Sequence, residues 1–119
     1  MSYEFYKVIH LVGLSMVIMS LGGILVFAIN GGQKATNSFR KGAMITHGVG
    51  LLLTLVAGFG MLHKAQIPGF PGWAVGKLII WLALGAFVGL AYKQNLARKL
   101  WIVLPLLIAV GAVLAIVKP

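Results

Sequence analysis

The sequence predicts an all-α polytopic membrane protein, an up-down antiparallel bundle of four transmembrane helices. Three observations lead to this fold class. Of the 119 residues, 61% are hydrophobic and 9% are charged, whereas soluble domains are about a quarter charged. The apolar residues fall in four runs, each of about the 20 residues that cross a bilayer. Most Lys and Arg residues stand between these runs. We therefore expect a single membrane domain over residues 1–119.

The four runs are separated by segments that end helices. The first run ends at the Asn-Gly-Gly of residues 30–32, and the second at the polar residues 63–66. Lys-Gln-Asn at residues 93–95 closes the third run, and Lys-Pro at residues 118–119 stops the fourth. Short connections of this kind place consecutive helices antiparallel. The expected helices cover about residues 4–29, 42–62, 73–92 and 100–117. Pro105 then falls near the start of the fourth helix, where proline is tolerated.

Lys and Arg in the connections predict the orientation of the bundle, because cytoplasmic loops carry an excess of these residues. Six lie in or beside the first and third connections: Lys34, Arg40, Lys41, Lys93, Arg98 and Lys99. The opposite side has four: Lys7, Lys64, Lys77 and Lys118. We therefore expect a protein of the bacterial inner membrane, with the first and third connections in the cytoplasm and both termini on the outer, periplasmic side.

The composition excludes several classes of chemistry. The chain has no Cys, which excludes disulfides, thiolate metal sites and iron–sulfur clusters. Glu4 is the only acidic residue, so paired-carboxylate sites such as those of glycosidases and di-iron proteins are excluded as well. The net charge is +9, but the cations lie between apolar runs. The expected partners are therefore membrane lipids and not nucleic acid.

Glycines in the apolar runs predict where helices approach one another, since the absence of a side chain lets backbones come close in lipid. The candidates are Gly22, Gly23, Gly48, Gly50, Gly58, Gly60, Gly85 and Gly89. We expect most of them to pack helices within one chain. The GxxxG pair formed by Gly85 and Gly89 leaves a second interpretation open, a homodimer.

Five ionisable side chains fall within or at the ends of the expected spans: Lys7, His10, His47, His63 and Lys77. Such groups are costly in a bilayer and are functional candidates by default. Lys7 stands one turn from His10 on the same helix face, and the helical rise places His10 roughly 9 Å below the outer surface. Lys77 and His63 belong to that side too. Glu4 stands one further turn out on the first helix. We expect Glu4, Lys7, His10, Lys77 and, less directly, His63 to converge in one pocket of the outer half.

Histidine within a helical bundle is a common axial ligand of haem iron. A pair of His10 and His47 is unfavourable, because the two are offset by roughly 15 Å along the membrane normal. His10 with His63 or with Met61 is more compatible with one iron. The alternative for each histidine is a hydrogen bond to a neighbouring helix or hydroxyl, and for His63 a solvated place at the interface. Each lysine could equally extend to the membrane surface.

Short motifs in the first half of the chain resemble a known group of small membrane proteins. Residues 6–10, Tyr-Lys-Val-Ile-His, resemble the K-x-x-H opening of the first helix in proteins of the HemJ type. Residues 39–46, Phe-Arg-Lys-Gly-Ala-Met-Ile-Thr, are similar to the start of their second helix. The SirB family has a similar pattern, including a histidine where His47 stands.

The second half of the chain extends the resemblance. Residues 73–78 resemble the W-x-x-x-K opening of a later helix, and residues 104–119 resemble a last helix that bears proline and ends in V-K-P. HemJ-type proteins are protoporphyrinogen oxidases that carry haem b. The resemblance therefore implies a haem pocket in which His10 is an axial ligand and Lys7 and Lys77 hold propionates.

Other elements of the HemJ pattern are missing here. The Trp and Arg of their first helix are absent from residues 16–27, their third-helix His is absent from residues 87–89, and their Asn-Glu is replaced by Ile102 and Val103. The resemblance therefore does not imply the oxidase reaction, and whether the protein is an enzyme stays open.

Two functional hypotheses follow. In the first, the protein binds haem b or another porphyrin in the outer half of the bundle and has a redox or porphyrin-handling role. In the alternative, it is a structural or assembly subunit of a larger membrane complex, with no cofactor. A small transporter is a weaker third possibility, because the sequence lacks a convincing internal repeat.

Overall fold

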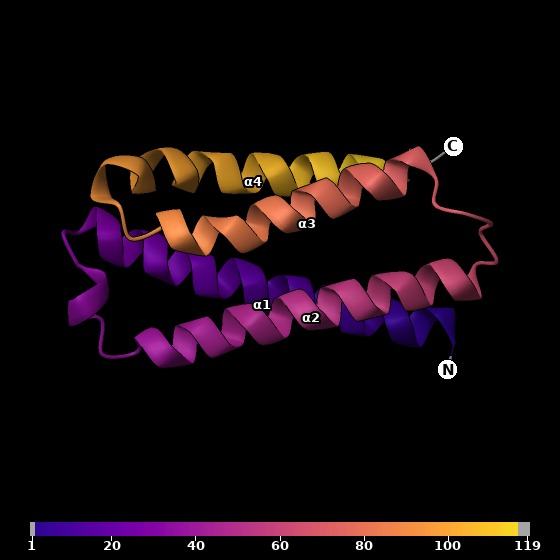
Figure 1. The fold of residues 1–119 in the computed structure, drawn as a ribbon, viewed down its shortest axis with the longest axis horizontal. Helices are drawn as coiled ribbons and strands as arrows, with labels where there is room; N and C mark the ends of the chain where they lie inside the picture. The colour runs from indigo at the N-terminus through magenta and orange to yellow at the C-terminus, as the bar shows by residue number, and fades with distance from the viewer. Residues whose placement is uncertain (1, 117–119) are drawn as a thin grey trace.

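The computed structural model describes residues 2–116, which form an all-α bundle of four long helices (Figure 1). The helices are α1 (Tyr3–Ile29), α2 (Arg40–Lys64), α3 (Gly72–Leu90) and α4 (Gln94–Ile116), with a short 3-10 helix, η1 (Lys34–Thr36), between α1 and α2. Each of the four is long and apolar enough to cross a membrane. The predicted fold class is confirmed, and by length and composition the chain is a multi-pass membrane protein.

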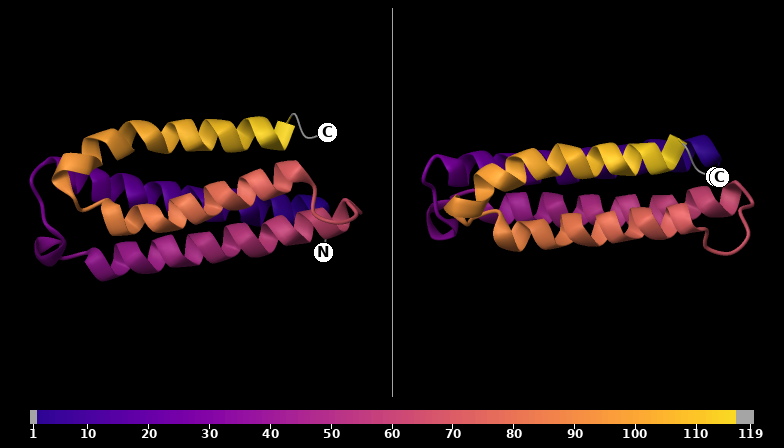
Figure 2. Two further views of the ribbon diagram at one scale, coloured as in Figure 1. Left: turned by 45° about the horizontal axis from the view of Figure 1, so that its top comes forward. Right: turned by 90° about the horizontal axis from the view of Figure 1, so that it is seen from above.

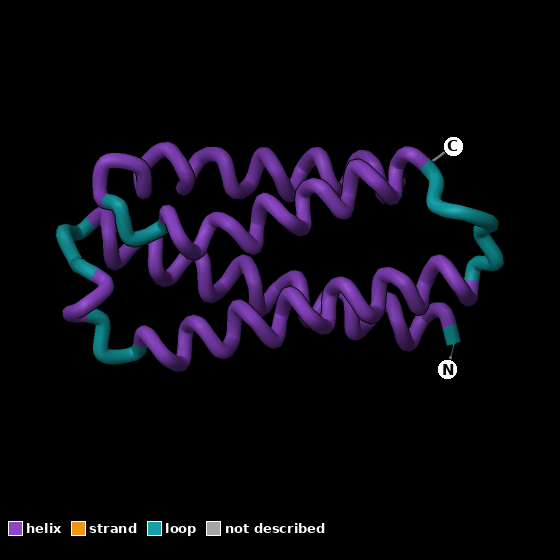
Figure 3. The backbone as a smooth tube through the Cα atoms, in the orientation of Figure 1, coloured by secondary structure: helices purple, strands orange, loops and turns teal. Residues whose placement is uncertain are grey.

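Consecutive helices run antiparallel, so the connections alternate between the two ends of the bundle (Figure 1). The start of α1, the α2–α3 loop and the end of α4 lie together at one end of the bundle. We call it the cavity end, after the cavity described below. The η1 segment and the α3–α4 turn lie at the other end, which we call the basic end. Figures 2 and 3 show the same pairing of ends from further views and as a backbone tube. The bundle measures 47 × 25 × 17 Å.

The first three expected helices match the observed ones to within two residues, but α4 begins at Gln94 rather than near residue 100. The polar segment at its start contains Leu, Ala, Arg and Lys, which are good helix formers. Hydropathy marks where a chain enters the membrane, and here the helix continues beyond that point. The expected end of α4 at residue 117 lies outside the described residues.

The earlier start of α4 also changes the position of Pro105. It lies in the interior of the helix and not near its start, as expected from the sequence. Proline has no backbone N–H, so the carbonyl of Trp101 lacks its usual partner one turn later. Membrane helices tolerate the loss of such a backbone hydrogen bond. Beyond Leu104, the α4 side chains that face inward line a cavity, and of these Leu107 and Ile108 also pack against the core.

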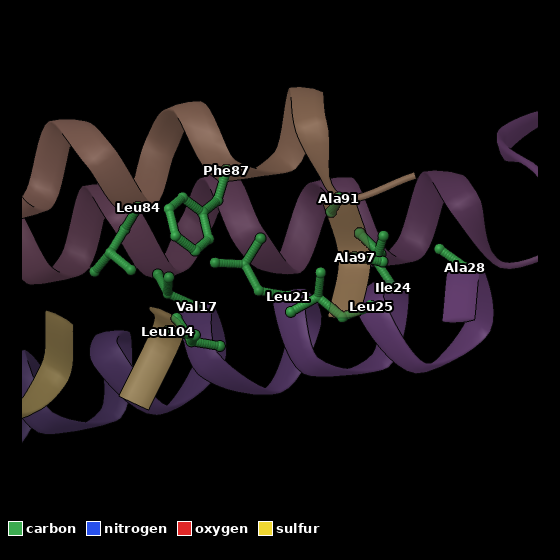
Figure 4. Close-up of a cluster of buried hydrophobic side chains, with 10 residues drawn as sticks. All are labelled: Val17, Leu21, Ile24, Leu25, Ala28, Leu84, Phe87, Ala91, Ala97 and Leu104. Carbon is green, nitrogen blue, oxygen red and sulfur yellow. The ribbon is translucent and has the colours of Figure 1, made fainter. Parts of the chain in front are cut away.

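The packed core lies in the half of the bundle nearer the basic end (Figure 4). Its buried side chains come from the second half of α1, the second half of α3 and the start of α4. They are Val17, Leu21, Ile24, Leu25, Ala28, Leu84, Phe87, Ala91, Ala97 and Leu104. Of the most apolar stretch of each helix, 39% of α1 but only 6% of α4 is buried. Helix α1 is therefore the central element, and α4 presents most of its surface outward.

Helices α1 and α2 approach each other closely at Gly13 and Gly50. A Cβ atom added to Gly13 would lie 2.8 Å from the Gly50 carbonyl oxygen, and one added to Gly50 would lie 2.7 Å from the Gly13 carbonyl oxygen. Real Cβ atoms do not come so close to backbone, so both positions require glycine. Gly50 is one of the predicted contact glycines, whereas Gly13 is not.

The other predicted contact glycines divide into two groups. Gly58 and Gly60 lie against the side chains of His10 and Tyr6, and Gly22 and Gly85 make ordinary contacts with neighbouring helices. For Gly23, Gly48 and Gly89, a Cβ atom would meet no described atom within 4 Å. The expectation of close helix contacts at these three positions is wrong for the single chain, because they face outward from the bundle.

Candidate functional site

A cavity of about 360 Å³ lies in the half of the molecule that the core leaves open, between the α1–α2 and α3–α4 pairs. Its volume is in the range of small-molecule pockets. All four helices contribute to its wall, which is largely apolar and includes the aromatic rings of Phe59, Phe70, Trp73 and Trp81. A few polar groups interrupt this lining, as is typical of a site that binds an apolar ligand in a fixed orientation.

The structure brings three of the five residues that were expected to converge to this cavity, and the expectation is wrong for Glu4 and His63. Lys7 and His10 from α1 and Lys77 from α3 all line it. Lys7 is exposed, and His10 and Lys77 are partly buried. Glu4, the only acidic residue of the sequence, is exposed and is not among the lining residues. The polar part of the cavity is therefore basic.

His63 lies apart from this group. It is exposed in the last turn of α2 and does not contribute to the described wall of the cavity. Met61, two residues earlier, does line it. Of the two partners considered for His10 from the sequence, the structure therefore places only Met61 at the cavity.

The imidazole of His10 is held by the backbone of α2. Its Nδ1 lies 2.9 Å from the carbonyl oxygen of Thr54, and because a carbonyl only accepts, Nδ1 donates the proton. In the neutral ring, Nε2 then carries the lone pair. Gly58 lies against the ring, and a Cβ atom there would make an ordinary contact with its Cε1 at 3.5 Å. Histidines that bind metals are commonly oriented by a backbone carbonyl in this way.

Two hydrogen bonds join α2 and α3 near the inner limit of the cavity. Trp81 Nε1 donates to the Leu51 carbonyl at 2.9 Å, and His47 Nε2 donates to the Leu84 carbonyl at 3.1 Å. One donor comes from each helix, so the pair fixes the two backbones relative to each other. His47 is 3% exposed. The bond agrees with the alternative considered for His47, a hydrogen bond to backbone.

Thr54 and Trp81 are absent from the set predicted from the sequence. Thr54 is uncharged, and its contribution is a backbone carbonyl, which no side-chain pattern reveals. Trp81 did carry a signal, because an indole N–H in the middle of an apolar span must find an acceptor. That signal indicates a helix contact but not which helix supplies the acceptor.

The donor set limits the kinds of metal that the site can hold. Among the described residues there is no group of three or more His, Cys, Asp or Glu side chains that could surround an ion. One imidazole alone does not bind a free metal ion stably. It can, however, complete the coordination of an iron that a macrocycle already holds, as in haem proteins. The residues present are therefore compatible with haem and do not suit a bare ion.

Comparison with known proteins gives no further guide to the site. No family model, no curated protein and no solved structure matches this chain.

Proposed function

We propose that this multi-pass membrane protein binds haem b, or a related porphyrin, in the cavity between its two helix pairs. In this proposal His10 would ligate the iron through Nε2, and Lys7 and Lys77 would pair with the propionates. The observation that carries the proposal is one imidazole, oriented by the Thr54 carbonyl, in an apolar cavity with two lysines.

The chemistry of a porphyrin complements these features. Its macrocycle is apolar and needs a dry, wide cavity, while its carboxylates favour ammonium groups near a membrane surface. The sequence resemblance to the HemJ and SirB groups supports the same class of ligand. A bound haem would supply one-electron redox chemistry or a handling site for porphyrin. The chain's own part is to ligate, to orient the ring through His10 and to exclude water.

Met61 is the candidate for a second ligand that would help to hold the iron. It lines the same cavity as His10, and a thioether together with an imidazole is an established axial pair that raises the potential of a haem. His63 has a solvated place instead, so we propose no ligand role for it.

We further propose that the protein lies in a bacterial inner membrane with its basic end in the cytoplasm. The basic end carries six Lys and Arg residues, whereas Lys7, Lys64 and Lys77 are the described ones at the cavity end. Lys118 lies outside the described residues. Both termini would then be periplasmic, and the cavity would lie in the outer half of the membrane.

An absorption spectrum of the detergent-purified protein, oxidised and then reduced with dithionite, tests the haem proposal. We expect a Soret band and sharp α and β bands, with or without added haemin. His10→Ala should abolish or strongly shift these bands, because it removes the ligand. His63→Ala is the matched control and should leave them unchanged, since His63 is exposed and away from the cavity.

A protein without absorbance bands, even after a haemin titration, would overturn the proposal. An unchanged spectrum in His10→Ala would overturn the assignment of the ligand alone. The first result would favour the alternative function, a subunit of a membrane complex without a cofactor, which co-purification with a partner protein would then identify.

A further inference from the structure

The basic end of the bundle carries a dense set of exposed cations. They come from η1, the start of α2, the α3–α4 turn and the first turns of α4. They are Lys34, Arg40, Lys41, Lys93, Arg98 and Lys99, and all six are exposed. The chain's only acidic residue, Glu4, stands in the first turn of α1, roughly 40 Å away along that helix. No side chain of the protein can neutralise these charges.

A hydrogen bond joins the two connections that carry the cations. Asn37 Nδ2, after η1, donates to Tyr92 Oη in the α3–α4 turn at 2.8 Å. Both connections lie at the same end of the bundle (Figure 1). The cations beside the start of α2 and those beside the start of α4 therefore belong to one surface, which we call the basic surface.

Helix dipoles add to the positive potential of the basic surface. Both α2 and α4 begin here, and a helix N-terminus carries about half a positive charge. Acidic residues usually offset this charge, but neither helix has one in its first turn. Arg40 and Lys41 instead occupy the first turn of α2. This arrangement is unfavourable for the protein alone and favours an external anion.

Two exposed aromatic residues indicate where that anion lies. Phe39, next to Arg40, is 70% exposed, and Trp101, one turn after Arg98, is 48% exposed. Aromatic side chains beside cations at the end of a membrane span are typical of the bilayer interface. The anions at that depth are the phosphates of lipid headgroups.

From this arrangement we infer that the basic surface is a binding site for anionic phospholipids in the leaflet that it faces. The inference goes beyond the proposed function and does not depend on it. The recognised chemistry is phosphate, and the source is the headgroup of a lipid whose chains pack beside the exposed apolar faces of α2 and α4. Zwitterionic lipids should bind the basic surface weakly, because their headgroups bring a cation with each phosphate.

The test uses the full chain in a neutral detergent. Native mass spectrometry measures how much lipid the protein retains, and thermal unfolding measures how much the lipid stabilises it. We expect phosphatidylglycerol to bind at least about tenfold more tightly than phosphatidylcholine and to raise the unfolding temperature. Each basic residue near a surface contributes about 1 kcal/mol of attraction, so R98Q alone should weaken binding about fivefold. A variant with R40Q, K41Q, R98Q and K99Q should lose most of the preference for phosphatidylglycerol over phosphatidylcholine. K64Q, at the cavity end, is the matched control and should keep it.

Two further measurements test the inference even if the variant with four substitutions does not fold. Binding to the unmodified protein should weaken in 0.5 M NaCl, because exposed charges are screened. Inorganic phosphate or glycerol 3-phosphate at millimolar concentration should not reproduce the rise in unfolding temperature. Equal binding of the two lipids, no effect of R98Q, or a full effect of free phosphate would each overturn the inference.

Discussion

At the scale of single residues, backbone groups define much of the candidate site. The His10 ring is oriented by a carbonyl of α2, and the ring lies against Gly58 of the same helix. The ionisable residues could be found from the sequence, because a charge or an imidazole in an apolar span is rare and costly. The carbonyl that positions His10 could not, because every residue has a backbone carbonyl and no side-chain pattern marks this one.

The contact of Gly13 with α2 gives a prediction for stability. G13A would place a Cβ atom 2.8 Å from the Gly50 carbonyl and 2.8 Å from the Thr54 backbone nitrogen, and backbone atoms cannot move aside locally. We expect a loss of about 1–3 kcal/mol in the free energy of unfolding, the usual cost of overpacking. Unfolding in mixed micelles of increasing dodecyl sulfate content measures it.

The matched control for G13A is G23A, another glycine of α1, where the added Cβ would meet no described atom within 4 Å. Both changes carry the same gain in helix propensity, so the difference between them isolates the contact. Equal stability of the two variants would contradict the close approach of α1 and α2 at Gly13.

At the scale of elements, hydropathy predicted all four helices because each contains a full apolar span. It could not predict that α4 begins at Gln94, because polar residues outside the membrane form helix as readily as loop. It also could not predict which glycines face a neighbour. Gly13 follows His10 by three positions, on the face of α1 that contacts α2, whereas the adjacent pair Gly22-Gly23 was the more conspicuous candidate.

The two bonds between α2 and α3 lead to a prediction about how these helices are held. W81F keeps an aromatic ring but removes the N–H that donates to the Leu51 carbonyl. We expect a loss of about 0.5–1.5 kcal/mol in unfolding free energy. Because Trp81 also lines the cavity, any bound haemin should be released faster.

The control for W81F is W101F in α4, where the ring is half exposed and a change within about 0.5 kcal/mol is expected. Thermal unfolding and the rate of haemin transfer to apomyoglobin measure the two effects. If W81F and W101F behaved alike in unfolding, the Trp81 bond would not contribute to the α2–α3 contact.

At the scale of the whole molecule, the bundle is divided along its length. The half near the basic end contains the core packed around α1, and the half near the cavity end contains the cavity. The sequence predicted that polar residues converge in one half, since their depths follow from the helical rise. It also predicted a pocket there, but not its volume, because an empty volume depends on how far two helix pairs separate.

The distribution of Lys and Arg over the two ends gives the last prediction, the orientation of the bundle in the membrane. The natural chain contains no Cys, so single cysteines report position without background. In intact cells, S38C at the basic end should resist a membrane-impermeant maleimide, because in the proposed orientation its six cations place this end in the cytoplasm. A65C, exposed in the α2–α3 loop, should react. Both should react after lysis, which controls for accessibility. Labelling of S38C alone in intact cells would reverse the orientation and place the cavity in the cytoplasmic half, where haem would have to enter from the cytoplasm.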